Sequence, residues 1–87
     1  MIAYLLYNKN TPGERQSTEL HARLEKEQVD SELLDADSPR GSAMAESYDV
    51  MARPAVILLK NDGAPLQIWQ GEDGLPPASE IGYLARQ

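Results

Sequence analysis

The sequence predicts an α/β fold in which a four-stranded mixed sheet carries helices on both faces. Two nearly unbroken apolar runs, Ile2–Tyr7 and Ala55–Leu59, are typical of strands covered on both sides, because a half-exposed strand alternates apolar and polar residues. A turn at Asp62-Gly63 follows the second run and has the residues of a tight hairpin. Helical patterns separate the other strands, so the predicted order is βαβαββα.

Size and composition exclude several classes of function. The 87 residues, 41% of them apolar, suffice for one small domain over residues 1–87 with a modest core. There is no cysteine, which excludes disulfides, thiolate metal sites and thiol chemistry. Fourteen acidic and eight basic residues give a formal charge of −6, which disfavours binding to nucleic acid or an anionic membrane. No stretch resembles a signal peptide or approaches the ~20 apolar residues of a membrane span, so we expect a small acidic cytoplasmic protein.

The first helix is expected to begin at or just after Thr11. Thr11–Glu14 has the form of a capping box, in which the threonine hydroxyl is available to the glutamate N–H and the carboxylate reaches back. Pro12 occupies the first helical position, where its missing N–H costs nothing. Gly13 weakens this start, and Ser17–Glu19 offers a competing one.

The remaining elements follow from apolar spacing and turn residues. Leu20 and Leu24 form the inward face of the first helix, which ends near Gln28. A strand within Val29–Ala36 is less apolar than the first and is therefore expected at an edge. The later elements are a turn at Asp37–Gly41, a short helix over Ser42–Tyr48 with Ala43, Met44 and Tyr48 inward, a strand over Leu66–Gln70, a loop over Gly71–Pro77, and a last helix opened by Pro76 or Pro77 that buries Ile81, Leu84 and Ala85.

Connection rules predict the topology of the sheet. The first two strands are joined through a helix and should be parallel with a right-handed crossover, whereas the hairpin makes the last two antiparallel. The most apolar strands, the first and the third, belong in the middle. The predicted strand order is therefore 2-1-3-4.

The stretch YDVMARPAVILLKNDG (Tyr48–Gly63), followed by PLQIWQGE, resembles the thioredoxin superfamily, closest to minimal glutaredoxin-like and short thioredoxin-like domains. In that family a valine-containing loop leads to a proline with a cis peptide bond, a buried strand, a turn with glycine, an edge strand and a glycine. The resemblance covers the whole chain and implies a cis Arg53-Pro54 bond. The residues in the corresponding places are Val50, Pro54, Gly63 and Gly71.

The active-site cysteines of that family are missing. Alignment on Tyr7 and on the first helix places Thr11 at the nucleophilic cysteine and Glu14 at the resolving one, with Pro12 at the proline common after the first cysteine. A threonine hydroxyl has no accessible alkoxide near neutral pH, so disulfide exchange cannot be carried over. We expect no catalytic residue and no cofactor.

The resemblance implies a binding face in place of a catalytic site. Family members hold extended peptide backbone against the residue before the cis proline, a form of β-augmentation that needs no cysteine. The leading hypothesis is thus a redox-inactive domain that binds a peptide or protein partner. The candidate binding residues are Thr11, Pro12, Gly13, Glu14, Arg53, Pro54 and Gly71.

Two other functions stay open. A helix N-terminus beside the Arg53 guanidinium would make a small anion site, which suggests weak glutathione or anion binding with transferase-like chemistry on a ligand thiol. Lys9 and Arg53 are the only basic candidates for that site, and Glu14 opposes it. A purely structural subunit of a larger complex is the third hypothesis, which the oligomeric state in solution would separate from the others.

Several side chains have simpler interpretations. We expect Arg53 to pair with Glu14 across the vestigial site, because a carboxylate is stabilised at a helix N-terminus; Asp49 or solvent is the alternative. A capping box alone would also account for Thr11 and Glu14. His21 has no second histidine or cysteine at ligand spacing, so no metal site is expected. Two aromatic residues are expected to serve in packing, since an acidic chain lacks the basic groove of a single-strand binder: Trp69 and Tyr83.

Overall fold

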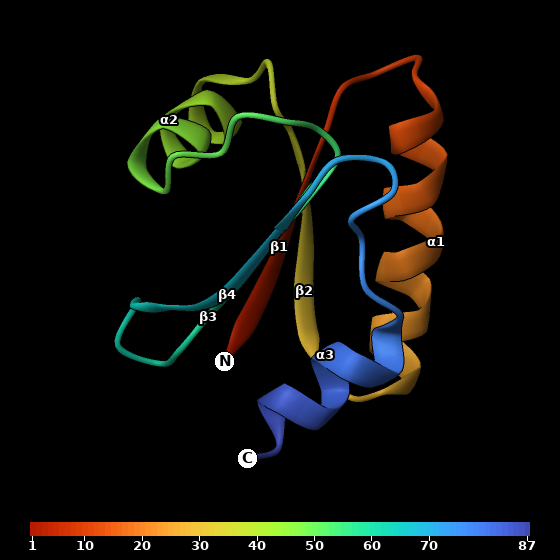
Figure 1. Cartoon of the computed structure of the whole chain (residues 1–87), viewed down its shortest axis with the longest axis vertical. Coiled ribbons are helices and arrows are strands. Elements are labelled where there is room, and N and C mark those ends of the chain that lie inside the picture. Colours follow the sequence, from red (N-terminus) through yellow and green to blue (C-terminus); the bar gives the residue numbers. More distant parts are fainter.

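The computed structural model describes residues 1–87 and contains one four-stranded sheet in the order β2-β1-β3-β4. β1 is parallel to β2 and antiparallel to β3, and β3 is antiparallel to β4. Helices α1 and α3 cover one face and α2 lies on the other (Figure 1). The predicted fold class and strand order are confirmed. The elements are β1 (Ile2–Tyr7), α1 (Pro12–Lys26), β2 (Asp30–Asp35), α2 (Pro39–Ser47), β3 (Ala55–Leu59), β4 (Pro65–Gln70) and α3 (Ala78–Ala85).

The central strands β1 and β3 contribute side chains to two separate apolar cores, one on each face of the sheet. All five residues of β3 are buried, and successive side chains of a strand point to opposite faces. Val56 and Leu58 therefore join the core under α1 and α3, whereas Ala55, Ile57 and Leu59 join the core under α2. This division explains why the strand is apolar without alternation.

A β-bulge changes the alternation in β4. Leu58 lies opposite Gln67 and Leu59 lies opposite Pro65, so Leu66 is an extra residue. As a result Leu66 packs against the same core as Trp69, three residues later, instead of alternating with it. The packing role predicted for Trp69 is confirmed by this contact.

The second helix begins earlier than predicted. The segment predicted to be a turn, Asp37–Gly41, contains the N-terminal cap of α2. The Ser38 hydroxyl accepts a hydrogen bond from the Gly41 N–H at 3.0 Å, and Pro39 occupies the first turn. The inward residues differ accordingly, because Ala45 is buried and Ala43 is exposed.

Tyr83 on α3 is exposed, contrary to the prediction. Its side chain is 62% exposed, so the packing role predicted for it is wrong. Tyr83 follows the fully buried Ile81 by two residues, which places it roughly 200° around α3 from the buried stripe.

No helix of the chain combines the length and apolar character of a membrane span.

Ser17 offers a test of the α1 packing. It lies on the buried face of α1 with 1% exposure, and its hydroxyl oxygen has no hydrogen-bond partner. Ser17→Ala is expected to raise the free energy of unfolding by about 1 kcal/mol, because an unsatisfied buried hydroxyl is removed and alanine favours the helix. Urea denaturation measures this change. The control is Ser42→Ala, at an exposed position of α2, with an expected gain of a few tenths of a kcal/mol; a loss of stability in Ser17→Ala would contradict the assignment.

Candidate functional site

Three segments predicted to form one face meet at Pro54. The first turn of α1 packs so closely on it that a Cβ added to Gly13 would lie 2.8 Å from the Pro54 Cδ. The Pro54 carbonyl accepts a hydrogen bond from the Gly71 N–H at 2.9 Å. The Arg53-Pro54 peptide bond is cis, as expected from the sequence. The start of α1, the approach to β3 and the end of β4 are thereby brought together.

The start of α1 keeps only part of the predicted capping box. Thr11 is the N-cap, but its hydroxyl donates to the Asn8 carbonyl at 2.6 Å instead of accepting the Glu14 N–H. The Glu14 carboxylate does reach back, to the N–H of Asn10 at 3.0 Å. Asn10 adopts the left-handed conformation with φ 61°, which asparagine tolerates well. The predicted reciprocal hydrogen bonds between Thr11 and Glu14 are therefore absent, whereas the predicted start of the helix is confirmed.

The predicted ion pair between Arg53 and Glu14 is also wrong. No salt bridge joins Arg53 to Glu14 or to Asp49, the alternative partner. The Glu14 carboxylate already accepts the Asn10 N–H, and Arg53 instead borders a pocket of about 300 Å³ beside α2 that Glu46 and Asp49 also line. The Arg53 Nε is buried there without a hydrogen-bond partner.

Gln70 is a residue of this face that the sequence did not reveal. Its side-chain Oε1 accepts hydrogen bonds from the main-chain N–H of Met51 at 2.8 Å and of Ala52 at 3.1 Å. A glutamine at the end of an edge strand has no distinctive sequence signal, and only the fold places it under this loop. It fixes the two residues that precede Arg53.

The main-chain groups of Arg53 have no hydrogen-bond partner. Neither its N–H nor its C=O takes part in any hydrogen bond of the structure. The neighbouring Met51 side chain is 84% exposed. This face thus has a main-chain N–H and C=O without hydrogen-bond partners next to an exposed apolar side chain.

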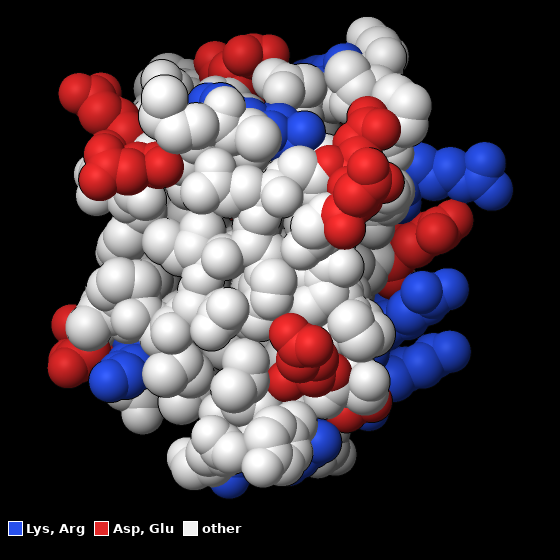
Figure 2. All heavy atoms as spheres, viewed as in Figure 1, with Lys and Arg blue, Asp and Glu red and all other residues white.

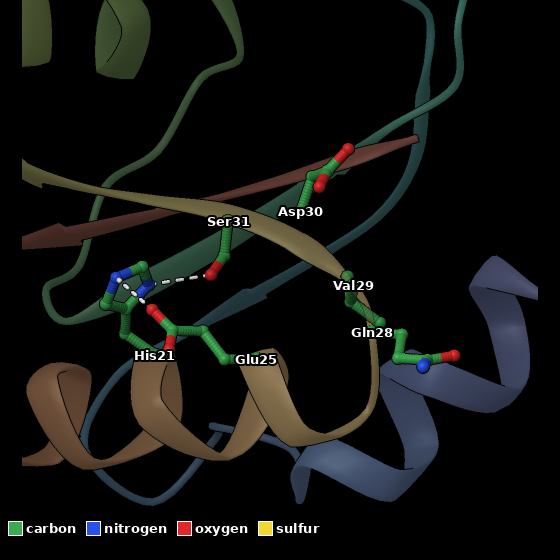
Figure 3. Close-up of a pocket in the computed structure, with 6 residues that line it drawn as sticks. All are labelled: His21, Glu25, Gln28, Val29, Asp30 and Ser31. Atoms are coloured by element: carbon green, nitrogen blue, oxygen red, sulfur yellow. Dashed lines mark hydrogen bonds and ion pairs between the residues drawn. The ribbon is translucent and has the colours of Figure 1, made fainter.

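A separate pocket of about 500 Å³ lies between the second half of α1 and the start of β2 (Figure 3). His21 Nδ1 is 2.7 Å from Ser31 Oγ, and His21 Nε2 is 3.7 Å from a carboxylate oxygen of Glu25. The Asp30 side chain points away from this group. The sequence alone does not reveal the pair formed by His21 and Ser31, because their contact depends on the packing of α1 against β2.

Known proteins resemble this chain in fold but not closely in sequence. No protein-family model and no curated protein matches the chain. Thioredoxin 1 from the thermophilic eubacterium Thermosipho africanus TCF52B is similar with a TM-score of 0.72 and 15% identity, over 99% of this chain and 92% of that one. A structure described as a malarial protein has a TM-score of 0.71 and 19% identity, over 98% and 92%. A thioredoxin from Thermus thermophilus has a TM-score of 0.61 and 19% identity, over 99% and 71%. The chain therefore has a thioredoxin-like fold that contains no cysteine.

Removal of the Gln70 acceptor is expected to loosen the loop before Arg53. In Gln70→Leu, hydrogen exchange at the Met51 and Ala52 amides should accelerate by about tenfold, since each N–H loses its partner. Gln70→Glu keeps an acceptor oxygen and should keep the protection. Exchange measured by NMR that is unchanged in Gln70→Leu would show that other contacts hold the loop.

Thr11 and Glu14, the positions that the sequence comparison aligns with the active-site cysteines of the thioredoxin superfamily, can be tested directly. Thr11 and Glu14 lie one turn apart at the start of α1, where the side chains of i and i+3 residues meet. The double variant Thr11→Cys/Glu14→Cys is expected to form a disulfide under mild oxidant, detected by mass spectrometry and thiol titration. Thr11→Cys/Thr18→Cys, two turns apart, is the control and should stay reduced as a monomer. A folded double variant that remains reduced would show that the alignment is shifted.

Proposed function

We propose that this cysteine-free thioredoxin-like domain binds an extended segment of a peptide or protein partner and performs no redox chemistry. The binding face consists of Thr11–Glu14, Met51–Pro54 and the loop after Gly71. The observation that carries the proposal is the free main-chain N–H and C=O of Arg53 directly before β3. Such groups can pair with an extended chain as an added strand.

The surroundings of Arg53 favour this mode of binding. Gln70 already holds the Met51 and Ala52 amides, so less conformational entropy is lost when a partner orders the loop. The exposed Met51 side chain is unbranched and polarizable, which suits contact with varied partner side chains. Gly13 lets α1 approach Pro54 and keeps the face compact.

The distribution of charge indicates the kind of segment that fits. Figure 2 shows the side of the molecule along β4, which adjoins this face: most of its atoms are uncharged, and separate acidic and basic groups lie among and around them. The sequence from Ala64 to Gly71 contains no charged residue, and Glu72 and Asp73 follow it. Because the whole chain also carries a formal charge of −6, the partner segment is expected to be neutral or basic.

The small-anion alternative has weaker support. Of its two basic candidates, Lys9 lies 3.6 Å from Asp35, and Arg53 borders a pocket that Glu46 and Asp49 also line. Carboxylates at these positions oppose the binding of phosphate or of the glutathione carboxylates. We therefore expect neither ligand to shift the amide resonances of Thr11–Glu14, and shifts there with either one would favour this alternative.

The proposal predicts which surface substitution weakens binding. Peptides selected from a displayed random library against the whole chain supply the probe. Met51→Asp should weaken the selected peptides by about tenfold or more, because the apolar contact of the methionine side chain is lost and the new carboxylate is desolvated on binding. Tyr83→Asp changes the other strongly exposed large apolar residue, on α3, and serves as the matched control. Calorimetry measures both affinities.

The outcome that contradicts the proposal is a selected peptide whose affinity Met51→Asp leaves unchanged. A loss confined to Tyr83→Asp would move the binding surface to α3. Circular dichroism of both variants checks that the fold is kept, which is expected because both side chains are mostly exposed.

A further inference from the structure

Ser31 on β2 and His21 and Glu25 on α1 lie next to one another in the pocket between these two elements (Figure 3). The 2.7 Å between Ser31 Oγ and His21 Nδ1 is within the range for proton transfer. Glu25 follows His21 by one helical turn, so α1 itself sets the carboxylate beside the other ring nitrogen, at 3.7 Å. This is the arrangement of a nucleophile, a base and a group that orients the base.

The two ring nitrogens have different roles in this arrangement. If Nε2 carries the ring proton, that proton faces the Glu25 carboxylate, and Nδ1 can accept a hydrogen bond from the Ser31 hydroxyl. When Nδ1 takes the serine proton, the ring becomes a cation, which the nearby carboxylate stabilises. Glu25 therefore acts through His21 and is a positioning residue.

The edge of the sheet supplies a main-chain donor next to the serine. The Ala36 N–H donates to the Tyr7 carbonyl at 2.7 Å, so Ala36 directs its main-chain groups toward β1. Main-chain direction alternates along a strand, which turns the groups of Ser31 and Leu33 away from β1 and toward the open edge. The Ser31 N–H is therefore available to a developing oxyanion.

We propose that Ser31 is an acyl-accepting nucleophile, with His21 as its base, in a site for small esters of neutral or cationic alcohols. The pocket is open to solvent and has a volume of about 500 Å³, so a small molecule has room to enter it. Glu25 and Asp30 border it, and Val29 is its only apolar residue, so anionic substrates are disfavoured. The site lies toward the opposite end of α1 from Gly13, and the inference does not depend on the peptide-binding proposal.

The chemistry balances with water as the only co-reactant. Ser31 Oγ bonds to the acyl carbon while its proton passes to His21 Nδ1. The bond from the acyl carbon to the alcohol oxygen then breaks, and the alcohol leaves with that proton. Water attacks the acyl–serine ester, gives a proton to the same nitrogen, and the carboxylic acid departs as the proton returns to Ser31 Oγ.

A fluorophosphonate probe and p-nitrophenyl acetate test the proposal on the intact chain. Peptide mapping by mass spectrometry should place the phosphonyl label on Ser31. Ser31→Ala should lose both the label and ester hydrolysis, and His21→Gln should slow both by about 100-fold or more. Ser47→Ala, at an exposed serine of α2, is the matched control and should change neither.

Two results would overturn the proposal. The first is a wild-type chain that takes no label at Ser31. The second is hydrolysis that falls in His21→Gln and persists in Ser31→Ala, since this identifies direct catalysis by the imidazole. For the positioning role, Glu25→Gln should lower kcat by about tenfold with KM little changed, whereas Glu19→Gln, at an exposed glutamate paired with Arg15, should alter neither.

Discussion

The close contact between Gly13 and Pro54 is the constraint on which the candidate binding face depends. A side chain at Gly13 would overlap the proline ring, so only glycine lets the first turn of α1 lie directly on the start of β3. Pro54 in turn accepts the Gly71 N–H, which fixes the end of β4 at the same point. Arg53 immediately precedes this contact point, and its side chain borders the pocket beside α2. This arrangement occurs in a thioredoxin-like fold that contains no cysteine.

The chain has no cysteine, so this face cannot carry out thiol chemistry, and its main-chain groups are the remaining means of recognition. Peptide recognition through the groups of Arg53 needs only a fixed backbone, which Pro54 and Gln70 supply from either side. The serine–histidine pair lies elsewhere, where α1 packs on the edge strand β2. The two surfaces therefore depend on different contacts of α1, its first turn and its second half, and substitutions can separate them.

The sequence predicted the fold well because the dominant signals were apolar runs and turn residues. Ala55–Leu59 identified a doubly covered strand, and Asp62-Gly63 identified the hairpin. The same signals could not reveal the extra residue Leu66, because a bulge depends on strand register. The directions of side chains could not be predicted from the sequence. The predicted Arg53–Glu14 ion pair is absent, because the Glu14 carboxylate accepts the main-chain N–H of Asn10 and the Arg53 side chain borders a pocket beside α2. Likewise, the hydrogen bonds that Gln70 accepts from Met51 and Ala52 exist only because the fold brings the end of β4 next to the loop before β3.

Hydrogen exchange at the Arg53 amide tests the peptide-binding account most directly. This N–H has no partner in the free chain, so its exchange should be fast. Saturation with a selected peptide should slow it by about tenfold or more, because the amide then donates to the main chain of the added segment. Unchanged exchange at Arg53 with the peptide fully bound, or protection gained only at the β4 edge, would contradict the account.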